Sequence, residues 1–318
     1  MNSAEQIRIW CHGTWLQKAR ENDAIETITI DSRNIEKPEG SLFVALKTPL
    51  RDGHDFIADC WHKGVRNFLV SGDIDTAKYT GANFIKAGDT LKALQQVAAK
   101  HRGLFGLPVI GITGSNGKTM IKEWLYQLLS SQYSIVRSPK SYNSQVGVPL
   151  SVWQIEQEHN LGIFEAGISQ PGEMEQLEQM IKPTIGVFTN IGEAHSEGFL
   201  NLRQKVNEKL LLFRNVSQLV YCADHAELNE SIAHFNRQVR SGTKNEPLRL
   251  FTWSHNHEAD LRVSRIFNEL GRTTIVALFK GKEISISIPF NDLASIENAI
   301  HCWCILLLMG IKGKHIQE

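Results

Sequence analysis

The chain contains 318 residues, of which 42% are hydrophobic and 21% are charged, and its 34 basic residues balance its 34 acidic residues. Zero formal net charge gives no overall attraction to nucleic acid or to an acidic membrane surface. The apolar runs stay well short of the roughly 20 residues that span a bilayer, the N-terminus lacks the pattern of a signal peptide, and the five scattered cysteines are typical of a reducing compartment. The composition therefore predicts a cytoplasmic globular protein of about two domains that binds no nucleic acid and has no membrane span.

A small α/β unit is predicted over residues 1–105. Short β-rich runs alternate with helical patterns in this half: Ile25–Ile30, Leu42–Leu46 and Asn67–Ser71. Judged by spacing alone, its conspicuous polar side chains belong to turns and helix caps: Asp31, Arg33, Asp52 and His54. The stretch Leu104–Pro108 predicts a hinge to a second domain over residues 106–318.

The stretch Pro108–Leu129 combines an apolar β-rich run, a glycine-rich turn and a helical pattern. The turn and the start of the helix supply six candidate ATP-binding residues: Gly114, Ser115, Asn116, Gly117, Lys118 and Thr119. In such a strand–loop–helix the backbone N–H groups and the helix N-terminus bind phosphate, the lysine neutralises the β- and γ-phosphates, and the hydroxyl binds Mg²⁺. Ile112 stands where the strict G-x-x-x-x-G-K-[ST] pattern has its first glycine, so an ordinary glycine-rich turn with an exposed lysine is the alternative. The flanking strand and helix favour ATP binding.

Strands and helices alternate through the rest of the chain, which predicts a mostly parallel sheet with helices on both faces. Ligands bind such sheets at the carboxyl ends of the strands. Glu165 ends one apolar strand, where a carboxylate beside a phosphate loop is expected to bind a metal ion, and His195 follows the next predicted strand. The alternatives are a helix-capping glutamate and an ordinary loop histidine. The predicted fold class is α/β: a small N-terminal α/β domain followed by a phosphate-loop ATPase domain with a mostly parallel sheet.

The loop sequence GITGSNGKT, residues 111–119, resembles the ATP loop of the Mur ligase superfamily, which also includes folylpolyglutamate synthetase. The stretch from DSR to DGH, residues 31–54, resembles the N-terminal domain of two members of this family, which add the third amino acid and D-alanyl-D-alanine. Two further stretches are similar to the member that adds D-alanyl-D-alanine: SPKSYNSQVGVPLS in residues 138–151 and HSEGF in residues 195–199. EAGISQPGEM resembles the family pattern E-L-G-x-x-x-x-G-E-I, with Ala166 in place of leucine. The resemblance extends over nearly the whole chain.

The resemblance implies an ATP-dependent ligase with ATP and Mg²⁺ as cofactors. Its reaction would join UDP-N-acetylmuramoyl-tripeptide to D-alanyl-D-alanine through an acyl phosphate, in the synthesis of the peptidoglycan precursor. The N-terminal domain would hold the UDP end of the substrate. By the same resemblance, the substrate-binding residues would be Ser32, Arg33, Gly53 and His54 near the uridine, and Asn143 and Ser144 near the phosphate.

The resemblance also implies which residues bind metal and the adenine. The metal ligands would be Thr119, Glu165, His195 and a carbamylated Lys209, and the catalytic residues would be Lys118, His195 and Lys209. The position of the modified lysine after the histidine selects Lys209. Lys205 is the alternative, because Leu211 stands where the family usually has an acidic residue. Asn298 matches the second asparagine of the family pattern H-N-x-x-N-A. In the family this segment lies against the adenine, so the resemblance makes Asn298 an ATP-binding residue.

Members of this family have a third, C-terminal Rossmann-like domain that closes over ATP and brings in the amine substrate. The resemblance implies that this domain is absent from the 318 residues, so we expect weak nucleotide binding and little or no ligation. A fused alanine racemase in a longer protein is an open alternative.

Two other functions also stay open. One is another ligase of the superfamily, either the third-residue-adding Mur ligase or folylpolyglutamate synthetase. The other is a regulatory phosphate-loop ATPase that binds no UDP-sugar.

Overall fold

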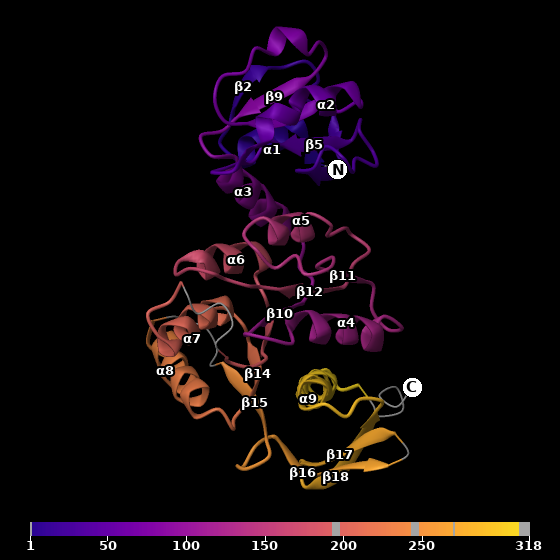
Figure 1. Ribbon diagram of the computed structural model, residues 1–318, viewed down its shortest axis with the longest axis vertical. Helices are drawn as coiled ribbons and strands as arrows, with labels where there is room; N and C mark the ends of the chain where they lie inside the picture. The colour runs from indigo at the N-terminus through magenta and orange to yellow at the C-terminus, as the bar shows by residue number, and fades with distance from the viewer. Residues whose placement is uncertain (1, 193–197, 243–247, 270, 312–318) are drawn as a thin grey trace. The chain divides into compact units, whose positions relative to one another are not determined.

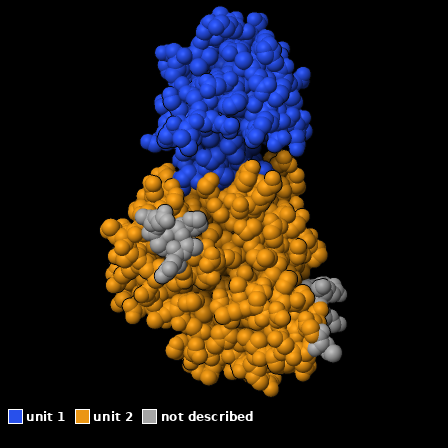
Figure 2. Space-filling model, viewed as in Figure 1, with its two compact units in different colours: residues 1–106, 145–155 blue, residues 107–144, 156–318 orange. Residues whose placement is uncertain are grey.

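The computed structural model describes residues 2–192, 198–242, 248–269 and 271–311. Two compact units are present, residues 1–106 with 145–155, and residues 107–144 with 156–318 (Figure 2). The predicted division near residue 105 follows the chain without interruption, whereas the structure groups residues 145–155 with the N-terminal segment. A separate function for each unit stays a prediction.

The first unit is built on a five-stranded sheet in the order β2-β9-β8-β5-β4, in which β2 is antiparallel to its neighbour and the other strands are parallel. The strands are β2 (Thr14–Gln17), β4 (Thr27–Thr29), β5 (Ser41–Val44), β8 (Asn67–Val70) and β9 (Asn83–Lys86). Every residue of β5 is buried, as expected for a parallel strand covered on both faces. Leu42 and Val44 pack in one hydrophobic core and Phe43 packs in another, because successive side chains point to opposite faces.

Helices and short elements complete the first unit. Its helices are α1 (Ala4–Trp10), α2 (Ile57–His62), α3 (Thr90–Arg102) and α5 (Gly147–Val152), with 3₁₀ turns η1 (Gly53–Phe56) and η2 (Thr76–Lys78). Two small antiparallel pairs join β1 (Asn2–Ser3) to β3 (Ala24–Ile25), and β6 (Lys47–Thr48) to β7 (Arg51–Asp52).

Side-chain hydrogen bonds hold the segment 145–155 in the first unit. The Gln95 amide donates to the backbone carbonyl of Gln145 at 3.2 Å. The Trp153 indole N–H donates to the Glu26 carbonyl at 3.0 Å, and its ring is buried in the same core as Leu42 and Val44 of β5. These contacts come from residues far apart in the sequence, which is why composition and spacing do not reveal them.

The second unit is built on a nine-stranded sheet in the order β11-β12-β10-β13-β14-β15-β16-β17-β18 (Figure 1). Its strands are β10 (Val109–Thr113), β11 (Ile135–Arg137), β12 (Leu161–Glu165), β13 (Ile185–Phe188), β14 (Gln218–Cys222), β15 (Arg249–Ser254), β16 (Leu261–Glu269), β17 (Arg272–Phe279) and β18 (Lys282–Ile288). Pairing is parallel from β11 to β16 and antiparallel from β16 to β18. The predicted α/β class with a mostly parallel sheet is confirmed.

The strand order places the phosphate loop where ligands bind in such sheets. The chain leaves β10 for β11 and β12 on one side and then for β13 on the other, so the order reverses at β10. A crevice for a ligand forms at such a reversal, beyond the carboxyl ends of the strands. The loop after Thr113 lies at that end of β10.

Helices surround this sheet. They are α4 (Lys118–Leu129), α6 (Glu173–Ile181), α7 (Leu202–Leu210), α8 (Ala226–Gly242) and α9 (Leu293–Leu308), with the 3₁₀ turn η3 (Leu211–Phe213). Helices α4 and α9 pack against each other and share one core with β10, including Ile112, Leu125 and Ile300 (Figure 1). Across the described ranges, none of the helices is sufficiently long and apolar to span a membrane.

Candidate functional site

The glycine-rich loop between β10 and α4 depends on two glycines. Gly114 has φ 141° and Gly117 has φ 82°, a backbone region that L side chains rarely adopt. A Cβ on Gly114 would lie 2.0 Å from Thr189 Oγ1, and one on Gly117 would lie 2.2 Å from Asn298 Oδ1. Both positions therefore need glycine for conformation and for space. Ile112, which replaces the first glycine of the strict pattern, is a buried core residue of β10 and takes no part in the loop.

The residues that follow β13 hold the loop in place. The backbone carbonyl of Asn190 accepts the Ser115 N–H at 2.9 Å, and its side-chain oxygen accepts the Asn116 N–H at 2.9 Å. The Thr189 hydroxyl donates to the Asn116 carbonyl at 2.5 Å. Sequence reasoning missed Thr189 and Asn190, although their position at the carboxyl end of a strand was a signal that could have found them.

Three lysine side chains converge on carbonyl groups of the loop and its neighbour. Lys118 Nζ donates to Gly114 O at 2.9 Å and to Ser115 O at 3.1 Å, and Lys209 Nζ donates to Gly114 O at 3.0 Å. Lys205 Nζ donates to Gly192 O at 2.8 Å. Lys205 and Lys209 are almost fully buried.

The electrostatics of these lysines suit an anion. Burial lowers the pKa of Lys209 to about 7, and the charges of Lys118 and Lys205 act in the same direction. Burial also lowers the pKa of Lys118, helped by Lys205 and opposed by Glu165. Several cations in one poorly solvated place are costly without a counter-charge, and a phosphate group would supply that charge. The loop therefore fits a nucleotide phosphate both in shape and in charge.

A carboxylate lies beside the helix end of the loop. Glu165, the last residue of β12, is fully buried, and its Oε2 accepts the Thr119 hydroxyl at 2.9 Å. A hydroxyl oxygen next to a carboxylate oxygen is the kind of donor pair that Mg²⁺ prefers. Within the part of the chain that the structure describes, three or more His, Cys, Asp or Glu side chains never gather as a metal cluster. The predicted ligand His195 lies outside the described residues.

Two predicted residues from elsewhere in the second unit also reach this site. Asn143 Nδ2 lies 3.5 Å from Glu165 Oε2, and the Asn143 carbonyl accepts the Gly167 N–H at 2.8 Å. Asn298 is largely buried on α9, with its side-chain oxygen against Gly117. The structure thus brings the phosphate loop, Glu165, Lys209, Asn143 and Asn298 together, and Ser144 follows Asn143 as the last residue of this segment of the unit.

The predicted uridine residues lie in the first unit, where the fold itself uses them. His54 Nε2 accepts the Ser71 N–H at 2.9 Å, so its Nδ1 carries the proton and donates to Asp52 at 2.5 Å. A Cβ on Gly53 would lie 2.7 Å from backbone atoms of Leu46. These contacts match the turn-and-cap alternative, and a role in substrate binding stays a prediction.

The other two predicted uridine residues differ in exposure. Ser32 is buried, and its carbonyl accepts Lys63 Nζ at 2.7 Å. Arg33 is exposed and forms an ion pair with Asp31 at 2.7 Å. Of the two side chains, only that of Arg33 is open to solvent in this unit.

Comparison with known proteins identifies the family. The sequence matches the Mur ligase middle domain over residues 112–306. The chain belongs to the Mur ligase family. The predicted resemblance is therefore confirmed, and the match contains the loop, Glu165, Lys209 and Asn298.

Relatives of this Mur ligase chain extend the comparison. It is 30% identical over 299 residues to the UDP-N-acetylmuramoyl-tripeptide–D-alanyl-D-alanine ligase of Borreliella burgdorferi, covering 91% of this chain and 62% of that protein. The structure of MurF from Acinetobacter baumannii superposes with a TM-score of 0.83 at 24% identity, over 99% of this chain and 66% of that chain. MurF ligase from Thermotoga maritima in complex with ADP gives a TM-score of 0.78 at 20% identity, over 92% of this chain and 65% of that chain. The chain thus spans about three fifths of the length of the curated relative it matches.

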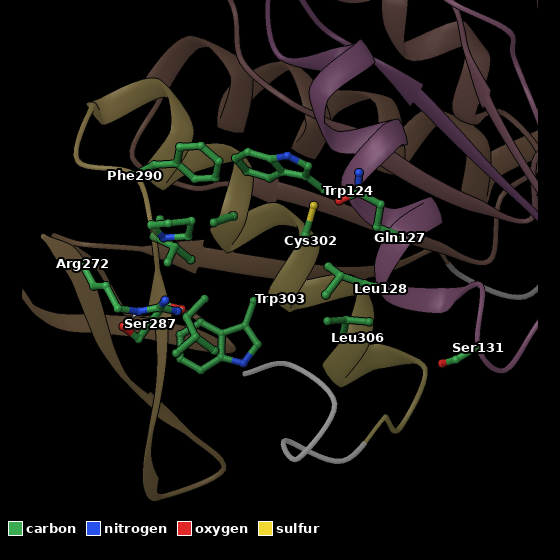
Figure 3. Close-up of a pocket in the computed structure, with 14 residues that line it drawn as sticks. Trp124, Gln127, Leu128, Ser131, Arg272, Ser287, Phe290, Cys302, Trp303 and Leu306 are labelled. Carbon is green, nitrogen blue, oxygen red and sulfur yellow. Dashed lines mark hydrogen bonds between the residues drawn. The ribbon is translucent and has the colours of Figure 1, made fainter. Parts of the chain in front are cut away.

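A cavity of about 520 Å³ lies elsewhere in this Mur ligase unit, between α4, β18 and α9 (Figure 3). Trp124 and Phe290 stack at one end of it, with ring centroids 5.1 Å apart. Its lining residues on α4 include Trp124 and Leu128, which the helical period places on the side of the helix away from Thr119. The described candidate residues do not line this cavity, so it is separate from the site.

Proposed function

We propose that this chain is the substrate- and ATP-binding part of a Mur ligase that joins D-alanyl-D-alanine to UDP-N-acetylmuramoyl-tripeptide, and that it acts in the cytoplasm. The observation that carries the proposal is the contact between Thr119 and Glu165 beside a phosphate loop surrounded by lysines. The named activity of the Borreliella burgdorferi relative supports this substrate pair.

The residues of the second unit divide the work on ATP. The loop glycines and Lys118 would bind the phosphates, and Asn298 would lie near the adenine. Thr119 and Glu165 would hold Mg²⁺, together with His195 and a carbamylated Lys209. When bound, Mg²⁺ neutralises charge on the phosphate oxygens during transfer.

The chemistry needs positioning more than a protein nucleophile. The substrate carboxylate attacks the γ-phosphorus of ATP and ADP leaves, which gives an acyl phosphate. The amine of D-alanyl-D-alanine then attacks the acyl carbon and displaces phosphate, which gives the amide. Lys118 would neutralise the developing charge on the phosphates, and Asn143 would bind near the phosphate end of the substrate.

Substrate length provides the direct test of the proposed function. We expect this chain, with Mg²⁺ and ADP present, to bind UDP-N-acetylmuramoyl-tripeptide about tenfold more tightly than the dipeptide precursor, because a site built for the longer peptide leaves polar groups unpaired with the shorter one. Isothermal titration calorimetry measures both affinities, with a folate as the third ligand.

The other outcomes separate the alternatives. Preference for the dipeptide would assign the chain to the third-residue-adding ligase, and folate binding to folylpolyglutamate synthetase. ADP binding with no response to any of the three would favour the regulatory ATPase. Loss of ADP binding itself would contradict the phosphate-loop site.

The proposed function also predicts that Lys209 is carbamylated. With ¹³C-bicarbonate at pH 8, we expect a carbamate carbon signal by NMR that is absent from Lys209→Gln. Only the neutral amine adds CO₂, and burial lowers the pKa of Lys209 to about 7, so the signal should fade as the pH drops below 7. Lys205→Gln is the matched control, since Lys205 is also buried and donates a hydrogen bond to a backbone carbonyl, that of Gly192 beside the phosphate loop. A signal lost in Lys205→Gln and kept in Lys209→Gln would move the modification to Lys205.

A further inference from the structure

Lys122 is a fully buried lysine on α4, one helical turn beyond Lys118. Lys118 turns toward the phosphate loop, whereas the Lys122 ammonium points to the segment that follows β11. It donates to Ser138 O at 2.8 Å and to the Lys140 carbonyl, and it lies 3.3 Å from Glu165 Oε1. The Glu123 carboxylate also lies 3.1 Å from this ammonium, so protein acceptors account for all three of its N–H donors. Lys122 is thus committed to protein groups and is not a phosphate ligand.

The two oxygens of Glu165 have different neighbours. Oε1 faces the Lys122 ammonium, and Oε2 accepts the Thr119 hydroxyl at 2.9 Å. A carboxylate could otherwise rotate about its last bond and exchange its oxygens. Lys122 restricts this rotation because its ammonium attracts Oε1 in the protein interior, where Coulombic attraction is strong. The other oxygen is then directed at Thr119.

The same ammonium also fixes the segment that carries Asn143. Its acceptors Ser138 and Lys140 lie just before this residue, and Lys140 has the left-handed φ of 49° that non-glycine residues rarely adopt. Asn143 Nδ2 in turn lies 3.5 Å from Glu165 Oε2. One buried cation therefore orders both the carboxylate and the loop beside it.

We propose that Lys122 is a positioning residue that fixes Glu165 with its Oε2 toward Thr119, so that the pair is ready to hold a divalent cation with the nucleotide. This inference rests on the proposed function, because it assigns Lys122 a part in the same site. The inference goes beyond that function because the Lys122 side chain would contact neither the phosphate nor the metal. Groups that orient metal ligands in this way are typically worth 10- to 100-fold in metal affinity.

The test uses Mn²⁺ as the probe, titrated into the whole chain with ADP present and followed by electron paramagnetic resonance. Lys122→Met should weaken nucleotide-dependent Mn²⁺ binding by about tenfold or more. Binding of ADP in EDTA should stay unchanged, because Lys122 does not reach the phosphate loop. Gln127→Met, exposed on the opposite face of α4, is the matched control and should change neither affinity. Lys122→Gln keeps N–H donors for the two carbonyls and serves if the methionine variant does not fold.

A double-mutant cycle with Glu165→Gln separates positioning from a general structural effect. If Lys122 acts through Glu165, adding Lys122→Met to Glu165→Gln should change Mn²⁺ affinity little further. Unchanged Mn²⁺ binding in Lys122→Met, an equal loss of metal-free ADP binding, or a full effect in the Glu165→Gln background would each overturn the inference. Absence of nucleotide-dependent Mn²⁺ binding in the unaltered chain would instead overturn the proposed function, and the inference with it.

Discussion

Glu165→Leu should lower the free energy of unfolding by about 3 kcal/mol, because it removes the fully buried carboxylate partner of Lys122 and leaves the partly exposed Glu123 as the remaining one. The Glu165 and Lys122 side chains are fully buried, and their charged atoms lie 3.3 Å apart. Glu123 still lies 3.1 Å from the ammonium, but its side chain is partly exposed, so it offsets only part of the desolvation cost of the buried charge. Urea unfolding of the variant and of the unaltered chain measures the difference.

A double substitution provides the control for this prediction. Glu165→Leu combined with Lys122→Met replaces the ion pair by two apolar side chains, a change that is often close to neutral in buried pairs. The double variant should therefore regain part of the stability, because Lys122→Met also leaves the Ser138 and Lys140 carbonyls without their donor, while metal-dependent nucleotide binding stays lost. Equal stability of Glu165→Leu and the unaltered chain would show that the pair is not coupled in the folded state.

Gly114→Ala should weaken ADP binding by about 100-fold, because the loop can no longer adopt the conformation that surrounds the phosphate. The new Cβ would lie 2.0 Å from Thr189 Oγ1 and 3.0 Å from the Asn190 carbonyl oxygen. Thr189 cannot simply turn away, since its hydroxyl donates to the Asn116 carbonyl in the same loop. Titration calorimetry with ADP measures the loss.

Gly88→Ala is the matched control for Gly114→Ala. Gly88 lies outside the left-handed region, and a Cβ there would meet no heavy atom within 4 Å. It should bind ADP as tightly as the unaltered chain. If Gly114→Ala also does so, the loop conformation seen here is not the one that binds the nucleotide.

The sequence by itself determined the local features of this protein. The turn between β10 and α4 can be predicted from its own residues, because Gly114 and Gly117 adopt the positive φ angles of this turn without a distant partner. The alternation of apolar strands with helical patterns was likewise sufficient to predict the parallel sheet, since side-chain periodicity follows from local geometry. The identity of the family followed from motifs of the same local kind, and the match over residues 112–306 confirmed it.

Only the tertiary structure decided how these local features meet. Thr119 and Glu165 are 46 positions apart, and the pairing of β10 with β12 brings them together. The burial of Lys122 depends on acceptors from the segment after β11, which its position on a helix does not indicate. Thr189 and Asn190 hold the phosphate loop from the next strand, and α5 joins the first unit although it follows the loop in sequence. Such contacts depend on strand order and long-range burial, and no periodicity within a short stretch of sequence encodes them.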